Sequence, residues 1–132
     1  MHVVVDGMNV IGARPDGWWR DRAAARRSLV GRLGALAEGP DSVTAVFDGR
    51  AAPGEVEAAR TAGITVSFAP GGPNAADRAI VELVARSAAS SAGVRDITVV
   101  TSDANLAQQV RGLGAHVEGA GAFRARLDSL MP

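Results

Sequence analysis

In this 132-residue chain, an aspartate lies at or just after the end of three apolar segments. These aspartates are Asp6, Asp48 and Asp103. Asp6 directly follows Val3-Val4-Val5, a continuous run of β-branched residues. Such a run is typical of a strand that is buried on both faces of a parallel sheet. Ligands of open α/β sheets bind beyond the carboxyl ends of the strands, and those ends share one edge. We therefore expect these three carboxylates at the same edge.

A fourth aspartate, Asp77, is predicted to reach this edge from a helix. Asp77 begins the spacing i, i+3, i+4, i+7 of a buried helical face, and Asp103 begins a second such series. The two series are Asp77, Ile80, Val81, Val84 and Asp103, Leu106, Ala107, Val110. A helix that follows a parallel strand starts at the carboxyl edge, so both acids should point toward the space above Asp6.

Each acid also has a structural interpretation. An Asp in a first helical turn complements the helix dipole, Asn74 with Asp77 resembles a capping box, and Asp48-Gly49 resembles a routine turn. Together, however, clustered carboxylates are costly to bury without a cation. Hard oxygen ligands suit Mg²⁺ or Mn²⁺, so the sequence predicts a site for one of these ions.

Basic and aromatic residues cluster near the N-terminus. Extending the helical stripe of Leu29, Val30 and Leu33 backward places Arg22 and Arg26 on its inward face. They would then either bind substrate phosphate or pair with the acids. Trp18 and Trp19 could stack on unpaired bases, or close the loop over the core.

Composition excludes several kinds of chemistry. The chain has no Cys, so it forms no disulfide, thiolate zinc site or cysteine nucleophile. All 14 basic residues are Arg, which excludes a Walker A lysine and a Schiff base. No Gly-x-Ser-x-Gly is present, and His2 and His116 are too far apart in the chain to suggest an acid–base pair.

The net charge is zero but unevenly distributed. Residues 1–32 contain six Arg and three Asp. This local excess of positive charge would favour binding to the phosphate backbone of a nucleic acid. No apolar run approaches the ~18 residues of a membrane span, and the N-terminus enters a strand without a signal-peptide layout. We expect a cytoplasmic protein with no membrane contact.

The alternation of elements predicts one α/β domain over residues 1–132. The predicted strands are 2–6, 43–47, 64–68, 97–100 and 116–117, and residues 7–19 are predicted to form a loop. The predicted helices are 20–37, 52–60, 74–90, a segment ending near 111, and a last one containing Phe123, Leu127 and Leu130. This order favours a parallel sheet with helices on both faces.

Four short motifs follow one another along the chain: Asp6-Gly-x-Asn9-Val-Ile, Val46-Phe-Asp48-Gly, Ala76-Asp77-x-x-Ile80 and Thr101-Ser-Asp103. They resemble the NYN domain, and more narrowly its YacP-like branch within the PIN-like nucleases, and the match runs from Val3 to about Val117. The resemblance implies a three-layer Rossmann-like fold with strand order 3-2-1-4-5. It also implies an endoribonuclease that depends on Mg²⁺ or Mn²⁺.

The same resemblance assigns roles to individual residues. Asp6, Asp77 and Asp103 would hold the metal, and Asp48 matches a motif whose acid is a further ligand candidate. Asn9 would orient Asp6 or a water, and Thr101 or Ser102 would support the site and contact the substrate. With Arg22, Arg26 and Trp18, they form the predicted site for single-stranded RNA.

Two alternatives stay open. The first is a non-catalytic RNA-binding or ribosome-associated module, and the second is a PIN-type toxin nuclease. YacP-like proteins usually have a longer C-terminal portion than residues 118–132 provide, so ribosome association stays an open prediction. A haloacid dehalogenase needs Asp-x-Asp after the first strand, which Asp6-Gly7-Met8 lacks. A phosphoacceptor domain typically uses a lysine, and the chain has none.

Overall fold

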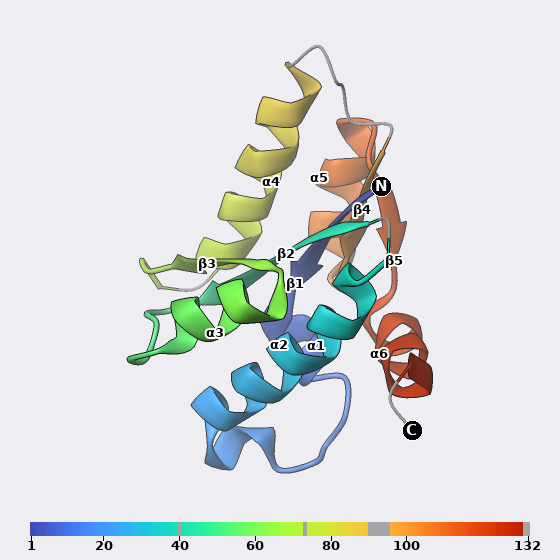
Figure 1. Ribbon diagram of the computed structural model, residues 1–132. Helices are drawn as coiled ribbons and strands as arrows, with labels where there is room; N and C mark the ends of the chain where they lie inside the picture. Colours follow the sequence, from blue (N-terminus) through green and yellow to red (C-terminus); the bar gives the residue numbers. More distant parts are fainter. Residues whose placement is uncertain (40, 73, 90–95, 131–132) are drawn as a thin grey trace.

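The protein folds around a parallel sheet of five strands. The computed structural model describes residues 1–39, 41–72, 74–89 and 96–130. The strands are β1 (His2–Asp6), β2 (Ser42–Asp48), β3 (Thr65–Ala69), β4 (Ile97–Val100) and β5 (His116–Glu118). Their order is β3-β2-β1-β4-β5, and every pairing is parallel (Figure 1). The predicted parallel sheet and its strand order are confirmed.

Helices cover both faces of this sheet (Figure 1). They are α1 (Gly7–Ile11), α2 (Arg22–Ala37), α3 (Glu55–Ala62), α4 (Ala75–Ala88), α5 (Ala104–Gly112) and α6 (Ala120–Leu130), with a short 3₁₀ turn η1 (Trp18–Arg20). Residues of α1, α2, α3 and α6 form one apolar core with the sheet, and residues of α4 and α5 form the other. Ser90, the predicted end of the helix over residues 74–90, and residues 131–132 lie outside the described residues.

The central strand β1 owes its position to its composition. Val3 and Val5 pack into the core under α2 and α6, whereas Val4 packs into the core under α4 and α5. All three are almost completely buried. Because β-branched side chains cover both faces, β1 is stable only between two helical layers. Its end, Asp6, therefore lies at the middle of the carboxyl edge.

The prediction of a loop over residues 7–19 is wrong for residues 7–11, which form α1. Val10 and Ile11 are buried in the core, so this turn is held by tertiary packing rather than by helix propensity. Gly7 is required at its start. A Cβ there would lie 2.3 Å from Cε1 of Phe47, which leaves no room for a side chain.

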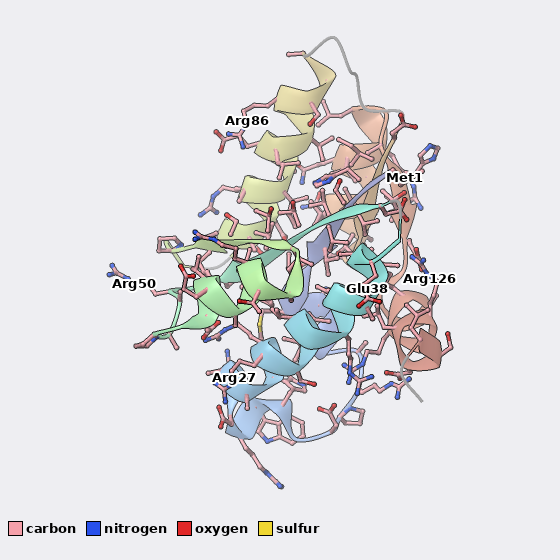
Figure 2. All side chains as sticks on the ribbon, in the orientation of Figure 1. Met1, Arg27, Glu38, Arg50, Arg86 and Arg126 are labelled. Atoms are coloured by element: carbon pink, nitrogen blue, oxygen red, sulfur yellow. The ribbon has the colours of Figure 1, made fainter. Side chains whose placement is uncertain are left out.

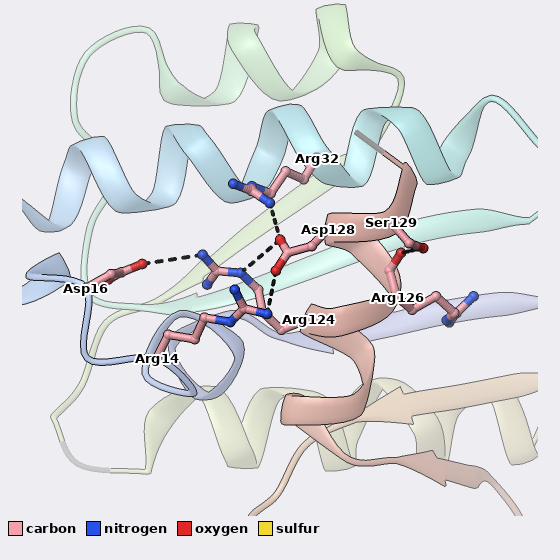
Figure 3. Close-up of polar contacts among 7 residues, drawn as sticks. All are labelled: Arg14, Asp16, Arg32, Arg124, Arg126, Asp128 and Ser129. Carbon is pink, nitrogen blue, oxygen red and sulfur yellow. Dashed lines mark hydrogen bonds and ion pairs between the residues drawn. The ribbon is translucent and has the colours of Figure 1, made fainter. Parts of the chain in front are cut away.

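A network of ion pairs joins the loop after α1 to α2 and α6. Asp128 on α6 pairs with Arg14, Arg32 and Arg124, and Arg124 also pairs with Asp16 at 3.4 Å (Figure 3). The partners come from three separate segments, so a single carboxylate holds them together on one side of the molecule.

Several charged side chains extend away from the body of the protein. The labelled Arg50 and Arg86 extend outward from the loop after β2 and from α4 (Figure 2). Within the described residues, no helix combines the length and the apolar character that crossing a membrane would require.

Candidate active site at the carboxyl edge of the sheet

Asp6 lies at the centre of this edge and is only 5% exposed. The hydroxyl of Thr101 donates a hydrogen bond to Oδ2 of Asp6 at 2.9 Å. The backbone N–H of Asp103 in turn donates to the Thr101 Oγ1 at 3.1 Å. β1 and β4 are paired in register up to Val5 and Val100, so Thr101 directly follows the paired residues beside Asp6. Thr101 thus links the two acids.

Asp103 also has a structural role at the start of α5. Its Oδ1 accepts a hydrogen bond from the backbone N–H of Leu106 at 3.0 Å, which makes Asp103 the N-cap of that helix. The capping interpretation is therefore correct for this residue. It uses one carboxylate oxygen and leaves the second for another ligand.

Asp48 caps a helix that lies far from it in the sequence. Its Oδ1 accepts a hydrogen bond from the backbone N–H of Ala76 at 3.0 Å, in the first turn of α4. Asn74 occupies the N-cap position of α4, but its side chain forms no capping bond. The capping-box interpretation of Asn74 with Asp77 is therefore wrong. Asp48 instead anchors the turn that holds Asp77.

The charges of these acids act on one another. Burial, together with the smaller effects of the charges on Asp77, Asp48 and Asp103, raises the pKa of Asp6 to about 6, against the lowering effect of the Thr101 hydrogen bond. The pKa of Asp77 is also raised, first by its burial and then by Asp103 and Asp48, while Arg78 acts in the opposite direction. The structure thus brings the four predicted acids into one electrostatic field.

In the part of the chain that the structure describes, only the charge of Arg78 near Asp77 offsets this group. Among the ion pairs of the described residues, none includes Asp6, Asp48, Asp77 or Asp103. The described residues also contain no three His, Asp or Glu side chains arranged to hold a metal directly. Mg²⁺ keeps several waters and is bound through only one or two carboxylates. An all-oxygen donor set with an uncompensated buried carboxylate fits such an ion in its chemistry.

Asn9 and Ser102 hold the loop between β4 and α5. The Oδ1 of Asn9 accepts a hydrogen bond from the backbone N–H of Ser102 at 2.8 Å. The Ser102 hydroxyl oxygen accepts one from the N–H of Ala120 at 2.8 Å, at the start of α6. In this structure Asn9 therefore positions the loop that carries Thr101, rather than Asp6 itself.

The two predicted arginines differ in their surroundings. Arg26 forms two hydrogen bonds to Glu55, at 2.9 Å and 2.7 Å, and both side chains are largely buried. Arg26 therefore pairs with an acid, but not with one of the four aspartates. Arg22 is exposed, not inward-facing, because it is the first residue of α2 and precedes its buried stripe. Its guanidinium lies 5.4 Å from the centroid of the Trp18 ring.

Sequence reasoning did not identify Glu55. The sequence indicates only an acidic residue in the first turn of a short helix. In the structure Glu55 is buried, and its Oε1 accepts a hydrogen bond from the N–H of Ala52 at 3.1 Å. Burial of the Arg26–Glu55 pair depends on the packing of α3 against α2, which the local sequence does not specify. The pair fixes Arg26, so its guanidinium has less freedom to bind a substrate.

The remaining candidates are the two tryptophans and His2. Trp18 lines a cavity of about 290 Å³ with residues of α2, and Trp19 is 49% exposed. His2 lies at the start of β1, the end opposite to Asp6, where its Nε2 is 3.1 Å from the Thr44 hydroxyl. His2 therefore lies away from the acidic edge.

A polar groove lies between α4 and α5, beside the aspartates, with a volume of about 280 Å³. Its α4 side consists of Asn74, Asp77, Arg78 and Val81, and its α5 side of Asp103, Asn105 and Gln109. We call it the α4–α5 groove. Two of the four acids thus form part of its wall.

A parallel sheet with this strand order is the fold of the nuclease-like α/β domains of the PIN-like group. Within that class, the chain belongs to the YacP-like NYN domain family, whose model matches residues 3–131. The family resemblance seen in the four motifs is thereby confirmed.

Solved structures give the same fold. The chain is similar to Rae1 (YacP) from Bacillus subtilis, with 23% identity, a TM-score of 0.70, and coverage of 98% of this chain and 75% of that one. A crystal structure of a mutant of the same protein gives 24% identity, a TM-score of 0.73, and coverage of 98% and 76%. A comparison with curated proteins yields no match for this chain.

Proposed function

We propose that this chain is a divalent-metal-dependent endoribonuclease that hydrolyses phosphodiester bonds in single-stranded RNA. The observation that supports it most directly is the buried carboxylate of Asp6, which interacts electrostatically with three further aspartates and has no cationic partner among the described residues. Membership of a nuclease-like family agrees with this proposal. Asp6, Asp77 and Asp103, with Asp48 beside them, would hold Mg²⁺ or Mn²⁺.

The ion, when bound, would lower the pKa of a water and offset charge on the scissile phosphate. The reaction then needs no histidine base. This agrees with the position of His2, which lies at the opposite end of β1 from Asp6. Thr101 orients Asp6 through its hydroxyl, and Asn9 keeps the Thr101 loop in place. Hydrolysis by water would leave a 5′-phosphate and a 3′-hydroxyl.

Residues near the start of α2 would contact the RNA. Arg22 is exposed and could bind a phosphate, and Trp18 beside it offers an aromatic surface on which an unpaired base could stack. Arg26 is paired with Glu55, so this pair adds no net positive charge beside them. Single-stranded RNA is favoured because its bases are unpaired and open to such stacking.

The test is cleavage of single-stranded RNA in Mn²⁺ by the whole chain and by two variants. Asp6→Asn and Asp103→Asn should each lower the rate by at least about a hundredfold, since loss of groups that merely support metal ligands already costs 10–100-fold. Asparagine at position 103 can still cap α5, which separates catalysis from folding. Glu82→Gln, on the exposed side of α4, should leave the rate unchanged. Full activity in excess chelator would refute metal catalysis.

One observation favours the alternative of a non-catalytic RNA-binding or ribosome-associated module. The described residues contain no group of three acidic or histidine side chains already arranged around an ion. Calorimetric titration with Mn²⁺ distinguishes the two. The nuclease requires binding that Asp6→Asn abolishes, whereas the module requires RNA binding without any metal binding.

A further inference from the structure

The α4–α5 groove opens directly onto the proposed cleavage site. Asp77 on its α4 side and Asp103 on its α5 side belong to the group of acids described above. A nucleotide whose phosphate lies at these acids would therefore place its neighbouring atoms in this groove. Its remaining wall residues thus decide which chemical group fits there.

Three carboxamide side chains line the groove, and the fold does not use them. Asn74 forms no capping bond, because Asp48 accepts the Ala76 N–H of that turn. Asn105 and Gln109 are exposed and lie four residues apart, on the same side of α5. Within the described residues, neither of these two side chains forms a hydrogen bond to the rest of the protein.

Beyond the acids, which would hold the ion, the groove wall is mostly neutral. It offers three carboxamides and a single guanidinium, that of Arg78. A neutral group with both donors and acceptors suits this wall, because each carboxamide also offers a donor and an acceptor. The edge of a nucleobase is such a group, and in single-stranded RNA it is accessible.

We infer that the α4–α5 groove holds the nucleobase next to the scissile phosphate and selects adenine through Asn105 and Gln109. The carboxamide of an Asn or a Gln can form two hydrogen bonds to adenine. Its oxygen accepts from the N6 amino group, and its NH₂ group donates to N7. The volume of about 280 Å³ is near the ~300 Å³ lower limit of small-molecule sites, which suits one base. This inference rests on the proposed function, because it needs RNA at the acidic edge.

The test measures base preference in binding and in cleavage separately. A randomised single-stranded RNA is bound to the unsubstituted chain in Mn²⁺ for a time too short for cleavage, and the bound, uncut fraction is sequenced. The same RNA is cleaved by the unsubstituted chain in Mn²⁺, and the cut sites are sequenced. We expect adenine over cytosine by about tenfold at one position, a value typical of a well-formed pair of hydrogen bonds.

The double substitution Asn105→Ala with Gln109→Ala should remove this preference in both measurements. Alanine favours helix, so α5 should stay folded, which circular dichroism checks. Gln108→Ala, next to Gln109 but outside the groove, should keep the preference. Binding or cleavage without base preference, or a preference that survives the double substitution, would overturn the inference and leave the proposed nuclease intact. An adenine preference in binding without any cleavage would instead support the inference and count against the nuclease.

Discussion

At the scale of single residues, the buried Asp6 carboxylate makes the stability of the fold depend on pH. Its pKa is about 6 in the folded chain, against 3.8 ordinarily, so the folded state holds this proton more tightly than the unfolded state. Raising the pH from about 4 to about 6 therefore lowers the free energy of unfolding. By the linkage relation this loss is on the order of 2–3 kcal/mol at neutral pH.

Asp6→Asn should consequently stabilise the metal-free protein at pH 7 while abolishing activity. Asparagine carries no charge at this buried position, and its Oδ1 can still accept the Thr101 hydrogen bond. The gain should disappear near pH 4, where Asp6 is protonated. Urea unfolding in chelator at several pH values measures it, with Glu82→Gln as the matched surface control. A gain that is independent of pH would contradict this explanation.

At the scale of secondary-structure elements, Asp48 connects the end of β2 to the beginning of α4. Asp48→Ala should lower the free energy of unfolding by about 1 kcal/mol, because the Ala76 N–H loses its capping acceptor. Asp48→Asn should retain most of this stability, since Asn also caps helices well. Chemical denaturation of both variants tests the prediction. Equal stability of the two would show that the cap contributes nothing.

The same two variants separate capping from metal binding. If Asp48 serves only α4, Asp48→Asn should cleave RNA like the unsubstituted chain, whereas a ligand role predicts weaker Mn²⁺ binding at unchanged stability. The relevant measurements are calorimetric titration and the rate of RNA cleavage.

At the scale of the whole molecule, Asp128 joins three segments through its arginine partners. Asp128→Ala should lower the free energy of unfolding by roughly 1–2 kcal/mol, more than an isolated surface pair, because several partly buried charges share one acid. Added salt should reduce the difference through screening. Arg86→Ala, which breaks the exposed pair with Glu82, should have little effect. A similar loss in both variants would contradict the network's special role.

Much of this architecture could be predicted from local patterns. β-branched runs such as Val3-Val4-Val5 indicated buried parallel strands, and the spacing from Asp77 to Val84 indicated the face of α4 that packs on the sheet. α1 was missed because its five residues have no local helical signal and are held by burial of Val10 and Ile11. The strand order came from family resemblance, since spacing alone does not determine which strands are neighbours.

The long-range contacts of the site could not be predicted in this way. The cap that Asp48 provides to Ala76 spans 28 residues, and the pair of Arg26 with Glu55 spans 29. Both depend on how complete helices pack against the sheet. The sequence thus indicates which residues lie at this edge, whereas the partners of these residues are determined only by the folded structure.

The caps of α4 and α5 have a practical consequence. The amide hydrogens of Ala76 and Leu106 are bonded directly to carboxylates of the acidic edge. An ion that draws electron density from Asp48 or Asp103 must change the magnetic environment of the amide groups of Ala76 and Leu106. Their ¹⁵N–¹H resonances should therefore shift as Mg²⁺ enters, giving the molecule two intrinsic spectroscopic reporters of occupancy that require neither RNA nor turnover.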